Sequence, residues 1–276
     1  MNLVDCNWLN QNLNNKNICI LDCSWHLPNV DRNGKDEFLK ERIPNSIYFD
    51  IDFFSDEDSS YPHMLSNKES FSNKVSDLGI KKDDHIICYD VLGIFTSPRV
   101  AWMFKQYGHE NISVLDGGFK NWKLNNLPIE TDKPISKEKS EYKASQSPTG
   151  AVSFEDVKKN IEDKEFILVD ARPSGRYNGT DPEPRKELQS GSIKGSINIP
   201  FSNLIDSNTG CLKNDEELKK VFDEKLKNQN QSVVFSCGSG VAAVIAGMAY
   251  QKINKKSFKI YDGSWTEWAI RNKIFK

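Results

Sequence analysis

The segment CGSG, from Cys237 to Gly240, combines residue types that can hold an anion at the base of a loop. An apolar run over 232–236 that is typical of a strand precedes it, and a small-residue stretch over 241–250 that is typical of a helix follows it. Glycine-rich loops turn backbone N–H groups inward, and the start of a helix adds positive partial charge. We therefore expect the anion to be the Cys237 thiolate or a persulfide. The alternative is a buried structural cysteine under a tight turn.

Other cysteine chemistries fit the sequence less well. A cysteine-dependent phosphatase needs a histidine before the cysteine and an arginine six residues after it, but Ser236 and Ala243 occupy those positions. The six cysteines lack CxxC spacing and the chain has only four histidines, so neither a zinc site nor a disulfide framework is predicted. We expect no metal and no organic cofactor.

The composition limits the partners of the protein. The net charge of -2 and the pI near 6.1 give no general attraction to nucleic acid or to anionic lipid. No apolar run approaches the roughly 18 residues that a membrane span needs, and the N-terminal residues lack the layout of a signal peptide. We therefore expect a soluble, cytoplasmic protein with no nucleic-acid or membrane partner.

Internal repetition divides the chain. Four pairs of similar stretches recur in the same order; for example, strands are predicted to end at Asp22 and at Asp170, and HIICYDVLG is echoed by SVVFSCGSG. The offset within the pairs stays between 146 and 150 residues. This indicates a duplicated unit of about 125 residues. We predict a first domain over 1–130, a polar linker over 131–150 and a second domain over 151–276.

The elements of the second unit predict its fold. FILVDA, SVVFS and FKIYD have the pattern of strands, whereas GVAAVIAGMAY and SWTEWAIR have the pattern of helices. Ser153 and Asn214 are predicted to cap two further helices at their N-termini. Strands that are apolar on both faces and alternate with helices indicate an α/β domain, with a parallel sheet flanked by helices on both faces. Ligands bind at the carboxyl ends of such strands, where Cys237 lies.

The duplicated VDAR, IKGSINIP and YDGSWTEW elements, together with CGSGVAA, resemble the tandem rhodanese-domain sulfurtransferases over both halves. The loop is similar to the mercaptopyruvate-type CGSGVTA, whereas thiosulfate-preferring relatives carry basic residues after the cysteine. Gly238 and Ser239 occupy those positions here, and Ala242 replaces the usual threonine. The resemblance implies two rhodanese-like domains and transfer of sulfur from 3-mercaptopyruvate through a Cys237 persulfide, with release of pyruvate. The loop residues that it implies for substrate binding are Gly238, Gly240 and Val241.

The resemblance also implies a proton relay of Asp52, His63 and Ser239. In the family, an aspartate and a histidine with this spacing of eleven residues join the serine of the CGSG loop. A histidine carries protons near neutral pH, an aspartate orients it, and a serine hydroxyl passes the proton on. The alternative is that His63, next to Pro62, is an exposed surface residue.

The stretch GRYNGTDPEPR supplies Arg176 and Arg185, which the resemblance implies as the grip on the carboxylate and keto oxygen of the substrate. A planar fork of N–H donors suits a 2-keto acid. The long, irregular stretch over 173–190 favours this reading over two surface arginines. We interpret Arg99 and Arg172 as structural pairing partners near the domain interface.

The first half has lost the nucleophile. Its repeat places Asp90 opposite Cys237, with Cys88 two residues earlier in the predicted strand. Because a carboxylate cannot take up sulfur, we expect the first domain to be non-catalytic and to donate Asp52 and His63 to a cleft between the domains.

Three functions remain open. The mercaptopyruvate reaction would pass sulfur to thioredoxin, to a small thiol or to cyanide. A thiosulfate sulfurtransferase is the second candidate, and the neutral loop argues against it. A catalytically idle tandem rhodanese that serves as a binding module is the third, and the intact cysteine argues against it.

Overall fold

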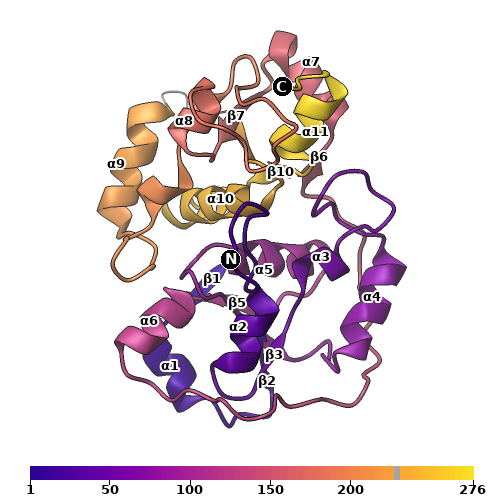
Figure 1. The fold of residues 1–276 in the computed structure, drawn as a ribbon, viewed down its shortest axis with the longest axis vertical. Coiled ribbons are helices and arrows are strands. Elements are labelled where there is room, and N and C mark those ends of the chain that lie inside the picture. The colour runs from indigo at the N-terminus through magenta and orange to yellow at the C-terminus, as the bar shows by residue number, and fades with distance from the viewer. Residues whose placement is uncertain (227–230) are drawn as a thin grey trace.

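Two five-stranded parallel sheets form the frame of the molecule, one in each half of the chain (Figure 1). The computed structural model describes residues 1–226 and 231–276. The first sheet has the order β1 (Asn2–Val4), β5 (Ile112–Leu115), β4 (His85–Tyr89), β2 (Ile18–Asp22), β3 (Ser46–Tyr48). The second has the order β6 (Ala151–Val152), β10 (Lys259–Tyr261), β9 (Ser232–Ser236), β7 (Phe166–Asp170), β8 (Ile197–Asn198). Corresponding strands occupy the same places, so the repeat in sequence is a repeat in topology.

Helices cover both faces of each sheet. Along β4, Ile86 and Cys88 join one buried cluster while Ile87 and Tyr89 join another on the opposite face. This alternation explains why the strands are apolar throughout. The helices of the first half are α1 (Cys6–Gln11), α2 (Gly34–Lys40), α3 (Ile51–Phe54), α4 (Lys68–Asp77), α5 (Ser97–Gln106) and α6 (Gly118–Leu124). Those of the second are α7 (Phe154–Asp163), α8 (Ser174–Asn178), the 3-10 turn η1 (Phe201–Leu204), α9 (Asp215–Lys225), α10 (Val241–Asn254) and α11 (Ser264–Arg271).

The predicted helix caps are confirmed. The Ser153 side chain accepts a hydrogen bond from the Asp156 N–H, and the Asp156 carboxylate accepts one from the Ser153 N–H; Asn214 and Glu217 form the same capping box. Each box satisfies two N–H groups that the first turn leaves without partners. Local sequence therefore determines where α7 and α9 begin.

The two halves share one core where α5 packs against α10 (Figure 1). All residues from Val241 to Tyr250 are buried, because the second sheet lies on one side of α10 and the first half on the other. This explains why α10 is apolar nearly all round. Arg99 of α5 is buried and pairs with Asp262 of the second half, 2.7 Å away, as expected for an interface residue.

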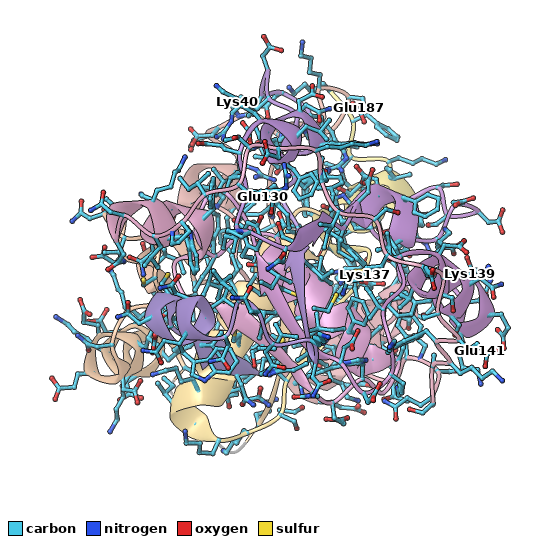
Figure 2. All side chains as sticks on the ribbon, turned by 90° about the horizontal axis from the view of Figure 1, so that it is seen from below. Lys40, Glu130, Lys137, Lys139, Glu141 and Glu187 are labelled. Carbon is cyan, nitrogen blue, oxygen red and sulfur yellow. The ribbon has the colours of Figure 1, made fainter. Side chains whose placement is uncertain are left out.

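The segment between the sheets lies along the first half. Tyr142 is buried in the first-half core, and the Tyr142 N–H donates to the Ser76 Oγ at 3.0 Å. Figure 2 shows Lys139 and Glu141 at the rim of the molecule, with Lys137 nearer the centre of that face. The polar residues of the segment between the sheets therefore form its outer side, while the buried Tyr142 holds the segment against the first half.

The stretch over 173–190 is less irregular than predicted, because α8 forms within it. Pro173 precedes the helix with a φ of -51°, and Gly179 ends it in the left-handed conformation at a φ of 81°. No helix among the described residues is long and apolar enough to cross a membrane.

Candidate active site

The CGSG loop, Cys237 to Gly240, connects β9 to α10. Its shape depends on Ser264, whose Oγ accepts hydrogen bonds from the N–H groups of Cys237 and Gly240, both at 3.1 Å. The same hydroxyl donates to the Tyr261 carbonyl at 2.8 Å. Ser264 adopts a φ of 51°, which is uncommon for a residue other than glycine. The hydroxyl thus holds both ends of the loop from below.

The remaining amides of the loop are free to bind an anion. The Cys237 carbonyl accepts from the Trp265 N–H, and the Gly238 carbonyl accepts from the Thr266 N–H, each at 3.0 Å, so these carbonyls point toward α11. Among the described residues, no hydrogen bond uses the N–H of Gly238, Ser239 or Val241. Together with the start of α10, they can stabilise a negative sulfur on the buried Cys237.

A relay of three side chains reaches the loop from the first half. The Ser239 Oγ lies 2.9 Å from the His63 Nδ1, and the His63 Nε2 lies 3.0 Å from the Asp52 Oδ1. The Asp52 carboxylate is out of line for a hydrogen bond to Nε2, so it acts there through its charge. That charge favours a proton on Nε2 and leaves Nδ1 to accept from the Ser239 hydroxyl. The His63 side chain is only 1% exposed, so the surface alternative does not hold.

Asp52 stands at the outer end of this relay with its side chain 60% exposed. The Trp25 Nε1 donates to its Oδ2 at 2.9 Å and fixes the carboxylate beside His63. Partial burial tends to raise the pKa of Asp52, but contacts with His63 and Trp25 and the charge of Arg185 hold that pKa below its usual value. Asp52 therefore stays anionic near neutral pH.

Three arginines, Arg172, Arg176 and Arg185, line the same cavity as the CGSG loop. Arg176 donates to the Glu183 Oε2 through Nε at 3.1 Å and NH2 at 2.5 Å. Arg172 binds the other oxygen of Glu183 at 2.7 Å and the Asp170 carboxylate at 2.6 Å. No hydrogen bond or ion pair joins the Arg185 guanidinium to any residue that the structure describes. Burial lowers the pKa of Arg185, an effect that nearby carboxylates only partly offset.

A cavity of about 150 Å³ joins these groups. The first half contributes Trp25, Leu27 and Phe95 to its wall, and the second half contributes Arg176, Arg185 and Cys237. A larger hollow of about 410 Å³ lies at the amino ends of β7, β9 and β10, and the described residues of its wall include no cysteine. The smaller cavity, at the carboxyl end of β9, is therefore the candidate active site.

The rhodanese-like domain model matches the chain twice, over residues 5–125 and 153–271. The chain belongs to the rhodanese family. It is 39% identical to the mouse 3-mercaptopyruvate sulfurtransferase over 98% of this chain and 92% of the mouse protein. It is 37% identical to the rat thiosulfate sulfurtransferase over 98% of this chain and 92% of the rat protein.

The crystal structure of SseA from Escherichia coli has the same fold, with a TM-score of 0.86 and 32% identity over 95% of this chain and 98% of SseA. SseA is described as a 3-mercaptopyruvate sulfotransferase with the rhodanese fold. The predicted family and α/β fold are confirmed. The relatives support a sulfurtransferase activity for this rhodanese.

The structure brings most of the predicted site residues of this rhodanese together. The predicted residues in the cavity wall are Cys237, Gly238, Ser239, Val241, Arg176 and Arg185. His63 and Asp52 reach the cavity through Ser239. Gly240 does not contribute its amide to the cavity, because Ser264 takes that N–H. Its left-handed φ of 76° instead shapes the turn, where an added Cβ would lie 2.9 Å from the Asp262 carbonyl oxygen.

The sequence did not predict every residue that lines or supports the cavity. Arg172 is a pairing partner as expected, but its partners lie within the second half and it lines the cavity. Trp25, Ser264 and Glu183 were not predicted. Glu183 had the clearest signal, because it stands in DPEPR between the two arginines of the predicted grip.

Proposed function

We propose that this rhodanese takes sulfur from 3-mercaptopyruvate and passes it, through a persulfide on Cys237, to a thiol. The observation that carries the proposal is the Arg185 guanidinium, which has no partner among the described residues and lines the same cavity as Cys237. A 2-keto acid offers the carboxylate that such a group binds best. Arg176 lies beside Gly238 and is positioned for the keto oxygen.

The first step forms the persulfide. The Cys237 thiolate attacks the sulfur of the substrate, and the carbon–sulfur bond breaks with its electron pair going to the enolate of pyruvate. The proton of the substrate thiol ends on the methyl carbon of pyruvate, and Ser239 and His63 move it while Asp52 stabilises the charged imidazole. The products are pyruvate and a Cys237 persulfide, whose charge the amides of Gly238, Ser239 and Val241 can stabilise.

The second step returns the enzyme to its thiolate. An acceptor thiolate attacks the outer sulfur of the persulfide, the sulfur–sulfur bond breaks, and Cys237 leaves as the thiolate. Thioredoxin, small thiols and, in an assay, cyanide are acceptors of the required chemistry. No step calls for a metal or an organic cofactor.

Thiosulfate is the alternative donor, since a relative of similar identity is named for it. The neutral Gly238 and Ser239 argue against it, because thiosulfate is a dianion and its departing sulfite needs cations at the loop. An idle binding module is disfavoured because the nucleophile, the relay and a free guanidinium are all in place.

The donor assay tests the proposal directly. Pyruvate release from 3-mercaptopyruvate and thiocyanate formation from thiosulfate and cyanide are measured on one preparation at equal enzyme. We expect the mercaptopyruvate reaction to have the larger kcat/KM. A larger kcat/KM with thiosulfate would make thiosulfate the donor. If neither donor is turned over, the remaining alternative is a catalytically idle binding module.

We also propose a cytoplasmic location and a division into a non-catalytic domain over 1–130, a linker over 131–150 and a catalytic domain over 151–276. The placement of Cys237 in the second half supports this division of roles. A plant relative is named as mitochondrial, so imaging of the tagged protein with organelle markers is the test of location.

A further inference from the structure

Glu183 is a buried carboxylate that stands behind the cavity wall. It is 6% exposed, and its two oxygens bind different arginines: Oε1 the Arg172 NH1 at 2.7 Å, and Oε2 the Arg176 Nε at 3.1 Å. Both arginines line the cavity, whereas Glu183 does not. Glu183 therefore acts on a bound molecule without touching it, through its own charge and through the arginines that it holds, and its charge also acts on Arg185.

The role of Glu183 differs for its two partners. Arg172 is also held by the Asp170 carboxylate, by the Gly191 carbonyl and by the Trp265 ring, whose centroid lies 4.4 Å from its guanidinium carbon. Among the described residues, Arg176 has no other ion-pair partner than Glu183. Within this part of the chain, Glu183 is thus the only carboxylate that neutralises Arg176.

The arginines and carboxylates around the cavity leave a small excess of positive charge. Three guanidinium groups, on Arg172, Arg176 and Arg185, face two carboxylates, on Asp170 and Glu183, so one positive charge remains, at Arg185, before the charge of the Cys237 thiolate is counted. Glu187 and Asp52 also act on Arg185 through their charges, but both are exposed and beyond ion-pair distance, so water screens them. The excess matches the single charge of one carboxylate.

We propose that Glu183 determines donor specificity by setting the charge of the cavity to suit a monoanion, such as a 2-oxo acid, and to disfavour a dianion. This inference rests on the proposed function and names a residue that selects the donor. A second negative charge on a bound molecule would find no cation, because Glu183 already neutralises Arg176. In a small, partly dry cavity, one uncompensated charge outweighs the contacts that a dianion could gain.

The test compares two nearly isosteric ligands, oxamate with one negative charge and oxalate with two. Their dissociation constants are measured by isothermal titration calorimetry at one ionic strength on the wild type and on Glu183→Gln. Asp181→Asn is the matched control, because it removes one negative charge from an exposed position of the same segment. We expect the wild type to prefer oxamate, Glu183→Gln to shift the preference toward oxalate by about tenfold or more, and the control to behave as the wild type.

An unchanged preference in Glu183→Gln, or an equal shift in Asp181→Asn, would overturn the proposal. If Glu183→Gln does not fold, the wild type still decides, since a preference for oxalate contradicts a cavity set for a monoanion. The donor assay on the wild type is separate from these titrations. If the wild type is active and Glu183→Gln keeps the wild-type ligand preference, only the role of Glu183 is rejected. If the wild type is inactive with 3-mercaptopyruvate, the proposed function is rejected.

Discussion

The loops that follow β4 and β9 occupy the same place in the two halves but hold different groups. In the first half, the Asp90 Oδ2 accepts hydrogen bonds from the N–H groups of Phe95, Thr96 and Ser97 at 2.9 to 3.0 Å. Burial raises the pKa of Asp90, and these hydrogen bonds offset part of that rise. In the second half, Cys237 occupies this position, and the N–H groups of Gly238, Ser239 and Val241 lack an acceptor among the described residues. The fold thus builds a place for an anion, and one residue decides whether a side chain fills it or a reaction uses it.

A second difference concerns the aspartates that end β2 and β7. Asp170 accepts from the Arg172 N–H at 2.9 Å and pairs with the Arg172 guanidinium. Asp22 accepts from the Ser24 N–H at 2.9 Å, but Ser24 stands where the arginine would be, and no described residue forms a hydrogen bond with the Asp22 Oδ2. Burial raises the pKa of Asp22 to about 7. The first half therefore lacks an arginine at the position of Arg172 as well as a cysteine at the position of Cys237.

The largest expected difference between the two halves is the effect of replacing their cysteines, Cys237 and Cys88. Cys237→Ser should abolish sulfur transfer, because serine has nearly the same shape and cannot form a persulfide. Cys88→Ala, which removes the thiol of the first-half strand, is the control and should keep wild-type turnover. Both are checked by pyruvate release and by circular dichroism. Activity in Cys237→Ser, or its loss in a folded Cys88→Ala, would reverse the assignment of the two halves.

The paired aspartate should matter more for stability than its counterpart. Asp170→Asn removes a carboxylate from the buried Arg172, so we expect the free energy of unfolding to fall by about 3 to 5 kcal/mol. Denaturant unfolding at neutral pH measures this change. A loss below about 1 kcal/mol would mean that Glu183 alone supports Arg172.

The proposed grip on the substrate carboxylate depends on Arg185, which has no ion-pair partner among the described residues. Arg185→Ala should raise KM for 3-mercaptopyruvate about tenfold to hundredfold, since a charge-assisted bond to a carboxylate contributes about 1.5 to 3 kcal/mol. The kcat should change less than KM. Steady-state kinetics measure both, with Asp181→Asn as a control in the same segment. Wild-type KM in Arg185→Ala would remove this residue from the substrate site.

Replacing Asp22 should have the smallest effect, and it should raise the free energy of unfolding, whereas replacing Asp170 should lower it. Its pKa in the folded state, about 7, lies above the ordinary value of an aspartate, so its contribution to stability is complete at pH 4 and is lost as pH rises through 7. Asp22→Asn should therefore match the wild type near pH 4 and be more stable at pH 8. We expect a gain of about 1 to 2 kcal/mol, because asparagine has no charge to bury at pH 8, although its Nδ2 offsets part of the gain where it takes the unpartnered position of Oδ2. Unfolding at the two pH values measures this difference, and equal stability at pH 8 would contradict it.

Features that depend on short stretches were predictable. The boundaries of α11, the caps at Ser153 and Asn214 and the position of Cys237 after β9 follow from patterns within a dozen residues. The repeat predicted two equal sheets because the same local patterns recur in order. The short α8 was missed because its glycine-containing sequence has weak helix propensity.

Contacts between distant residues were not predictable from local pattern. Ser239 and His63 are 176 residues apart and meet only because α5 packs on α10, so their pairing depended on resemblance to the family. Trp25 acts through one side-chain hydrogen bond and Ser264 through three, and neither residue type has a signal in sequence for such bonds. The lack of an ion-pair partner for Arg185 among the described residues also could not be predicted, because it depends on where the neighbouring carboxylates lie in the fold.

The most direct test of the account is the site of the transferred sulfur. The wild type is incubated with 3-mercaptopyruvate without an acceptor, its thiols are alkylated, and its peptides are mapped by mass spectrometry. The account predicts one added sulfur atom on the peptide that contains Cys237 and none on the peptide that contains Cys88. Added sulfur on Cys88, or pyruvate release without any added sulfur on Cys237, would contradict it.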